Sequence, residues 1–258
     1  MKKIITIVLT AVLFFVAAAL GVNSVFRVDS IELKINYVSE DAKIEAESLR
    51  NDLAQLYEKE SLFKAVALDA EIVFAQYPYF RLTNFKKEYP NKLVIEAAED
   101  AEVFSVKNGE SYYILSLDGT ILSIRESSEN RSDGKANVLL NGVEISGEKG
   151  QLCIGEKLNR MLPLLQELSV RFNGLRSNLV EVNYSLKGGS IEQYDITTRE
   201  GVIICVQRVD EFVAEKAEKI SDLYFSLEDG ERLKGYIYAT NGEEKATVVY
   251  NPTEIFFE

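Results

Sequence analysis

The chain has 258 residues and a net charge of −12, with 29 Lys plus Arg against 41 Asp plus Glu. A hydrophobic share of 47% is typical of a folded protein, and the length suits two domains of ordinary size. The acidic balance argues against nucleic-acid binding, which needs clustered cations. The sequence contains 0 His, so the commonest general base and metal ligand is missing, which argues against an enzyme or a metal site.

The first segment of the chain is basic and then apolar. Two lysines precede an apolar run that reaches from residue 4 to residue 22, and a helix needs about 20 such residues to cross a bilayer. We therefore predict a transmembrane helix over residues 4–22, with residues 1–3 in the cytoplasm and the remainder outside. A cleaved signal peptide is the alternative, because Ala17-Ala18-Ala19 also fits a cleavage site.

Residues 25–98 are predicted to form a first exported domain. Residues 30–37 alternate apolar and polar side chains, which is the period of a half-buried strand. In residues 42–56 the apolar side chains recur at spacings of four and three, which predicts an amphipathic helix that Ser39 can cap. The expected order is strand 30–37, helix 42–56, helix 67–77, strand 80–88 and strand 92–98.

Residues 99–258 are predicted to form a mainly antiparallel β domain. Pairs of turn-forming residues favour tight hairpins, because their central positions need positive φ; they are Asp118-Gly119, Asn141-Gly142, Gly188-Gly189 and Asn241-Gly242. Two packing helices are expected over residues 158–172 and 210–224, where apolar residues share one face. The predicted fold class is α+β.

No motif for catalysis, for a metal or for a cofactor is found in the sequence. The acidic groups at residues 99–102, 210–215 and 228–231 are interpreted as hydrated surface, and residues 126–135 as an exposed loop. Cys153 and Cys205 lie among apolar neighbours, which favours buried thiols, although a disulfide between them stays open.

Residues 78–122 carry a family resemblance. Pro78-Tyr79-Phe80 is followed by KKEYPNKLVIE over residues 86–96, by Glu99, and then by YYILSLDGTIL over residues 112–122. This succession resembles the FtsQ/DivIB family of bacterial cell-division proteins. The chain departs from the family pattern after Glu99, where Asp100 and Glu102 stand in place of an arginine and a proline.

The resemblance implies a POTRA-like domain and a β domain behind a single membrane span. It also implies a non-enzymatic scaffold of the divisome at the septum of the bacterial cytoplasmic membrane, with FtsB/DivIC-like and FtsL-like proteins as partners. In the family a partner adds a strand to the far edge of the β domain, which directs attention to the last strong strand.

The residues expected to bind the partner are Lys245, Ala246, Thr247, Val248, Val249 and Tyr250. Two alternatives stay open from the residues themselves. The strand can simply close its sheet, with Pro252 ending it. The chain can also be a secreted binding protein or a glycosidase, released by signal-peptide cleavage.

Overall fold

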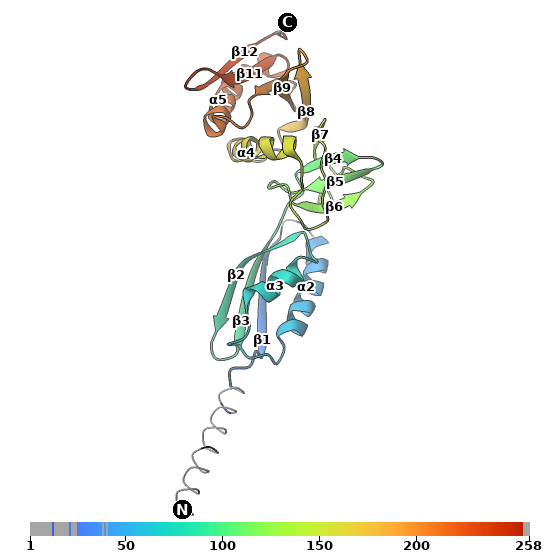
Figure 1. Cartoon of the computed structure of the whole chain (residues 1–258), viewed down its shortest axis with the longest axis vertical. Coiled ribbons are helices and arrows are strands. Elements are labelled where there is room, and N and C mark those ends of the chain that lie inside the picture. The colour runs from blue at the N-terminus through green and yellow to red at the C-terminus, as the bar shows by residue number, and fades with distance from the viewer. Residues whose placement is uncertain (1–11, 13–20, 22–24, 38, 40, 255–258) are drawn as a thin grey trace, which may run out of the picture. The chain divides into compact units, whose positions relative to one another are not determined.

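The computed structural model describes residues 12, 21, 25–37, 39 and 41–254. The chain divides into two compact units, Met1–Asp100 and Ala101–Glu258 (Figure 1). The transmembrane helix expected over residues 4–22 falls outside the described residues, apart from 12 and 21, and so does the choice between anchor and signal peptide. Among the helices that are described, none has the length and apolar character needed to cross a bilayer.

The first unit has the element order expected for it. Its elements are β1 (Ser30–Asn36), α2 (Asp41–Tyr57), α3 (Ala67–Phe74), β2 (Phe80–Glu88) and β3 (Lys92–Glu99). The sheet order is β1-β3-β2, with β1 parallel and β2 antiparallel to the central β3. Helices and strands enclose one apolar core between them.

The start of α2 is fixed by a buried polar group. The Ala42 N–H donates to Ser39 Oγ at 3.3 Å, which is the cap that the sequence predicts. Ser39 itself donates to the Glu99 carboxylate, from its N–H at 2.8 Å and from its hydroxyl at 2.5 Å. Glu99 is therefore buried beneath the cap, and the interpretation of this residue as hydrated surface is wrong.

The second unit contains a nine-stranded sheet in the order β12-β11-β10-β9-β8-β7-β4-β5-β6. Five neighbouring pairs are antiparallel, and three, β10·β11, β4·β7 and β7·β8, are parallel. The sheet is thus mainly antiparallel, as predicted, but it is mixed, because three of its neighbouring pairs are parallel. Its strands are β4 (Phe104–Asn108), β5 (Ser111–Leu115), β6 (Ile121–Arg125), β7 (Val138–Asn141), β8 (Leu179–Lys187), β9 (Ile191–Thr198), β10 (Ile203–Gln207), β11 (Tyr236–Asn241) and β12 (Ala246–Asn251).

Three of the four expected hairpin turns are present, joining β5 to β6, β8 to β9 and β11 to β12. Asn141-Gly142 does not form a hairpin, because β7 pairs with β4 and β8, both in parallel. Gly142 has a φ of +73°, and a Cβ there would lie 2.6 Å from the carbonyl oxygen of Tyr184. This glycine permits a close approach of two backbones rather than a tight turn.

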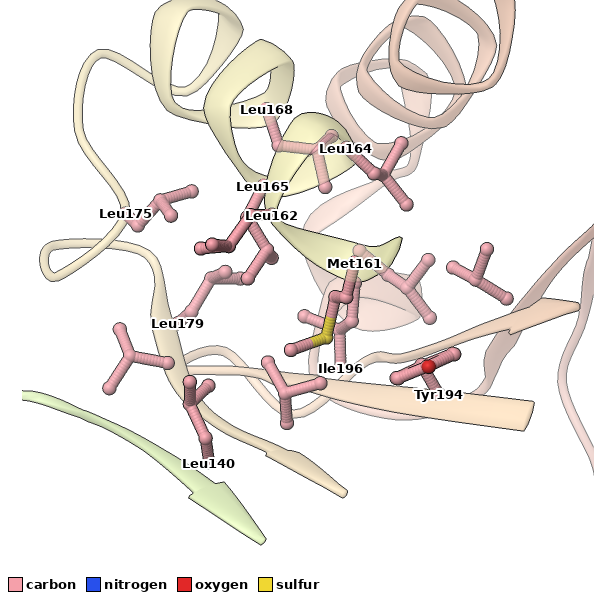
Figure 2. Packing of buried hydrophobic residues seen from close by; sticks show 14 of the residues in the cluster. Leu140, Met161, Leu162, Leu164, Leu165, Leu168, Leu175, Leu179, Tyr194 and Ile196 are labelled. Atoms are coloured by element: carbon pink, nitrogen blue, oxygen red, sulfur yellow. The ribbon is translucent and has the colours of Figure 1, made fainter. Parts of the chain in front are cut away.

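Both expected packing helices are present, as α4 (Glu156–Arg171) and α5 (Val213–Ser226), and a short α6 (Asp229–Arg232) follows. Figure 2 shows leucines of α4 directed at Leu140, Leu179 and Ile196 of the sheet, which are fully or almost fully buried. Cys153 and Cys205 are free thiols, and both are buried. They act as small apolar residues, which settles the question of a disulfide.

Candidate functional site

The strand β12 forms one edge of the nine-stranded sheet. It pairs antiparallel with β11, from Asn241 opposite Ala246 to Tyr236 opposite Asn251. Of the six residues expected to bind a partner, five lie in β12. The sixth, Lys245, lies in the turn before it, where its carbonyl accepts a hydrogen bond from the Gly242 N–H at 2.8 Å.

The side chains of β12 alternate between the core and the solvent. Ala246 is buried, and Val248 and Tyr250 pack against the apolar core of the unit. Tyr250 also covers Gly235, since a Cβ on that glycine would lie 2.6 Å from the Tyr250 hydroxyl oxygen. Thr247 and Val249 point to the other face and are exposed. Only these last two side chains are free to meet a partner.

The hydrogen bond between Gly242 and Lys245 also fixes which main-chain groups of β12 face outward. In an antiparallel ladder, directly bonded pairs alternate with pairs that do not bond each other. Because residues 242 and 245 are bonded and aligned with the register of the strands, the N–H and C=O groups of Thr247, Val249 and Asn251 face β11. Those of Ala246, Val248 and Tyr250 face away from the sheet.

The outward main-chain groups of Ala246 are occupied by two side chains of α5. The Ala246 N–H donates to Glu215 Oε2 at 3.1 Å, and its carbonyl accepts from Lys219 Nζ at 2.7 Å. Glu215 and Lys219 are themselves paired at 2.7 Å across one helical turn. The hydrogen bond from Lys219, aided by that from the Ala246 amide, holds the pKa of Glu215 below its ordinary value. We call these three residues the edge clamp.

Beyond the edge clamp the edge is open. Among the described residues, none donates to or accepts from the main chain of Val248 and Tyr250 on their outward side. Two exposed side chains, Thr247 and Val249, lie beside these main-chain groups on the solvent face. Val249 is 47% exposed and stands opposite Tyr238, whose ring stacks on Tyr236 with centroids 6.0 Å apart.

The sequence pattern identified the strand correctly but missed the clamp. Glu215 and Lys219 stand four residues apart on a predicted helix, a spacing typical of an ion pair on one helix face. Nothing in that spacing shows that both side chains also reach a strand that begins 27 residues after Lys219. The contact depends on the packing of α5 beside β12, which is a property of the tertiary fold.

The opposite edge of the same sheet, β6, is covered. The Ile121 N–H donates to the carbonyl of Gln151 at 2.8 Å, and the Ile121 carbonyl accepts from the Gly150 N–H at 2.7 Å. At the other end of β6, Arg125 forms two hydrogen bonds with the buried carboxylate of Glu102, at 2.9 and 2.7 Å. Glu102 is 2% exposed, so its interpretation as hydrated surface is also wrong.

The loop that follows β6 is partly buried as well. Asn130 is 4% exposed, although residues 126–135 were expected to be an exposed loop. Its amide donates to the main-chain oxygen of Glu102 and to the side-chain oxygen of Asn137, each at 3.1 Å. The Arg131 N–H adds a bond to Glu102 Oε2 at 3.0 Å. The loop is thereby attached to the start of β4.

A groove of about 620 Å³ in the second unit was considered as a catalytic site. Two carboxylates line it, Glu102 and Asp133, and each faces an arginine. Asp133 accepts from the Lys135 N–H at 3.0 Å and from Arg176 at 2.7 Å, and these contacts hold its pKa below the ordinary value. A general acid needs a raised pKa, so Asp133 does not suit that role in glycoside hydrolysis.

No protein-family model matches the chain. Two curated proteins are similar to it, and both are named cell division protein DivIB. The protein of Clostridium acetobutylicum is 27% identical over 117 residues, which are 43% of this chain and 44% of the relative. The protein of Clostridium botulinum is 24% identical over 186 residues, which are 72% of this chain and 68% of the relative.

The similarity thus spans less than half of one relative and about two thirds of the other. Both matches agree with the resemblance carried by residues 78–122. The identities are low, so the relationship is a distant one. These comparisons support a distant relationship of the chain to the FtsQ/DivIB family of cell-division proteins.

Proposed function

We propose that this chain is a membrane-anchored, non-enzymatic scaffold of the bacterial division machinery. In this proposal residues 4–22 hold it in the cytoplasmic membrane, the unit Met1–Asp100 is POTRA-like, and the nine-stranded sheet recruits partners outside the membrane at the septum. The partners are FtsB/DivIC-like and FtsL-like bitopic coiled-coil proteins. A role in cell division is supported by the names of both relatives.

The observation that carries the proposal is the open edge of β12 beyond the edge clamp. An extended segment of a partner can continue the sheet there, bonding the outward N–H and C=O groups of Val248 and Tyr250. Its side chains then lie next to Thr247 and Val249. Main-chain bonds supply affinity in this mode, and the neighbouring side chains supply specificity.

The structure changes which side chains are suitable for testing this binding. Val248 and Tyr250 are part of the core, so a substitution there alters stability together with binding. Val249 is exposed on the open edge at 47%, and Ile124 is exposed on the covered edge strand β6 at 45%. These two residues form a matched pair of apolar side chains on opposite edges of one sheet.

The experiment is a pull-down of the full-length, tagged chain from solubilised membranes of its native host. Wild-type protein is expected to capture the bitopic coiled-coil partners. Val249→Asp places a charge against the incoming strand, and we expect capture to fall by about tenfold or more, which corresponds to about 1.4 kcal/mol.

Ile124→Asp is the control and is expected to leave capture unchanged, because Ile124 lies on β6, at the edge of the sheet opposite β12. Equal loss in both variants, or undiminished capture by Val249→Asp, would move the binding site away from β12. A fluorescent fusion of the wild-type chain is expected to mark midcell. Uniform labelling of the whole envelope would contradict the division role itself.

A further inference from the structure

Three aromatic rings gather at one end of the first unit, and they do not belong to its core. The ring centroids of Phe26 and Phe63 lie 4.9 Å apart, and each lies 5.9 Å from the ring of Tyr89. Phe63 is 55% exposed and Tyr89 is 61% exposed. We call these three residues the aromatic cluster.

The backbone holds the aromatic cluster together. The Leu62 N–H donates to the Phe26 carbonyl at 2.7 Å, and Lys87 Nζ donates to the Phe63 carbonyl at 3.3 Å. The Asp29 N–H donates to the Asn91 carbonyl at 2.9 Å, which fastens the entry of β1 to the turn between β2 and β3. Figure 1 shows this entry and this turn at the same end of the unit.

The exposure of Phe63 and Tyr89 contrasts with that of the aromatic residues in the core of the unit. Tyr57, Phe74 and Phe80 are between 2% and 5% exposed. Large rings that stay in water give up the stabilisation that burial of their apolar surface would provide. A contiguous exposed aromatic surface is therefore typical of a face that another apolar phase covers.

The position of the cluster in the chain indicates which phase that is. Phe26 is four positions after Val22, the end of the predicted span, and an extended backbone covers at most roughly 3.6 Å per position. Phe26 therefore stands no more than roughly 14 Å from the end of the span. The headgroup layer on each side of the hydrocarbon is about 5 to 8 Å thick, so the cluster is within reach of it.

We propose that the aromatic cluster is a lipid-docking surface, which inserts into the outer headgroup layer of the membrane that anchors the chain. Tyrosine accumulates at this depth because its ring is amphipathic, and phenylalanine buries its apolar ring at the boundary between headgroups and acyl chains. The inference rests on the proposed membrane anchor and adds a second attachment to it, one made by the folded unit itself.

The charges around the cluster fit a lipid surface without a strong charge preference. Exposed residues of both charges are close to the cluster in sequence, Arg27, Lys59 and Lys64 with Asp29, Glu58 and Glu60, and Lys87 contacts the main chain of Phe63. Charges of mixed sign do not form the purely basic patch that selects anionic lipids. Docking is consequently expected on phosphatidylcholine and with little dependence on salt.

The chain contains 0 Trp, so each substitution to tryptophan introduces a single tryptophan whose emission can be followed. Full-length Phe63→Trp protein is reconstituted into nanodiscs of phosphatidylcholine, with and without bromine on the upper acyl chain. We expect brominated lipid to quench Phe63→Trp several times more strongly than the control variant Ile44→Trp, and the emission of Phe63→Trp to be blue-shifted. If Phe63→Trp and Ile44→Trp are quenched equally, the proposal is overturned.

The control is Ile44→Trp, because Ile44 is 73% exposed at the far end of α2. Thirteen residues of helix separate it from Tyr57, which is about 20 Å. A third variant, Phe15→Trp, reports on the anchor. Quenching of Phe15→Trp without quenching of Phe63→Trp rejects the docking surface alone, whereas no quenching of either rejects the anchor as well.

Discussion

The two edge strands of the nine-stranded sheet differ in which groups bind their outward main-chain N–H and C=O groups. At β6 a neighbouring segment bonds both main-chain groups of Ile121, and a bidentate ion pair between Arg125 and Glu102 holds the end of the strand. At β12, Ala246 is the one residue whose outward main-chain groups are occupied by the part of the chain that the structure describes, and the occupants are side chains rather than backbone. An edge that backbone covers cannot accept a new strand without unfolding, whereas β12 can accept one as it stands.

The two edges also differ in how deeply the ion pairs beside them are buried. The covered edge rests on a carboxylate with 1% side-chain exposure, and the open edge rests on a glutamate and a lysine with 35% and 38%. Buried pairs are costly to break, and exposed pairs contribute little. Substitutions should therefore affect stability at the covered edge, and binding or local dynamics at the open edge.

The largest effect is expected at the covered edge. Glu102→Ala leaves Arg125 without its main partner and removes an acceptor from the Arg131 N–H. We expect the free energy of unfolding to fall by about 3 to 5 kcal/mol, the range for breaking a buried ion pair. Chemical denaturation of the detergent-solubilised chain measures it.

Glu126→Ala, at an exposed position just beyond β6, is the control and should change stability by less than about 0.5 kcal/mol. If Glu102→Ala proves as mild as this control, the ion pair is not what holds the covered edge.

An intermediate effect is expected at the lysine behind the open edge. Lys216 lies on α5, is fully buried, and donates to the carbonyls of Gln207, at 2.8 Å, and Arg208. Burial lowers its pKa from 10.5 to about 8. Between these values the unfolded chain binds more protons, so raising the pH stabilises the fold.

The measurement compares wild type with Lys216→Met across this range of pH. The wild type should gain up to about 3 kcal/mol in free energy of unfolding relative to the variant between pH 8 and 10.5. The comparison removes the contributions of tyrosines and cysteines, which both proteins share. Lys234→Met, at an exposed position, should give a curve parallel to wild type; a parallel curve for Lys216→Met would contradict the lowered pKa.

The smallest effect is expected at the edge clamp. Glu215→Ala removes the acceptor of the Ala246 N–H, so hydrogen exchange of that amide should become several-fold faster relative to its intrinsic rate. In the wild type the pKa of Glu215 is lowered, so the protection persists at neutral pH. It is lost only as the pH falls through that lowered value.

Glu218→Ala, an exposed position on the same helix, should leave exchange at Ala246 unchanged. Exchange that is equally slow in Glu215→Ala would show that the carboxylate does not protect this end of the edge.

The sequence predicted those parts of the fold that local patterns control. Every element of the first unit follows from alternation or helical spacing within a few residues, and α3 differs only in ending at Phe74, before the turn that leads to Pro78. In the second unit three hairpins were predicted from their turn residues, whereas those joining β4 to β5 and β9 to β10 were not. The parallel pairs β4·β7, β7·β8 and β10·β11 were not predicted either, because their partners are joined by long connections whose register no dipeptide encodes.

The candidate site could likewise be predicted only where local sequence patterns control it. The last strand and the alternation of its faces were readable from residues 245–250, but the open or occupied state of each main-chain group was not. Glu99 and Glu102 were misinterpreted for a related reason. A carboxylate in a charged stretch resembles hydrated surface until its partners Ser39 and Arg125, far away in sequence, are brought to it by the fold.

The edge clamp limits the number of main-chain hydrogen bonds, and therefore the affinity, with which a single strand can dock on β12. With Ala246 occupied, two residues of β12 offer four main-chain groups, and four hydrogen bonds contribute roughly 2 to 6 kcal/mol in total. Micromolar binding requires about 8 kcal/mol. Under the proposed membrane anchor, a partner confined to the same membrane would meet this edge at a high effective concentration, so weak docking would become avid there and stay reversible elsewhere.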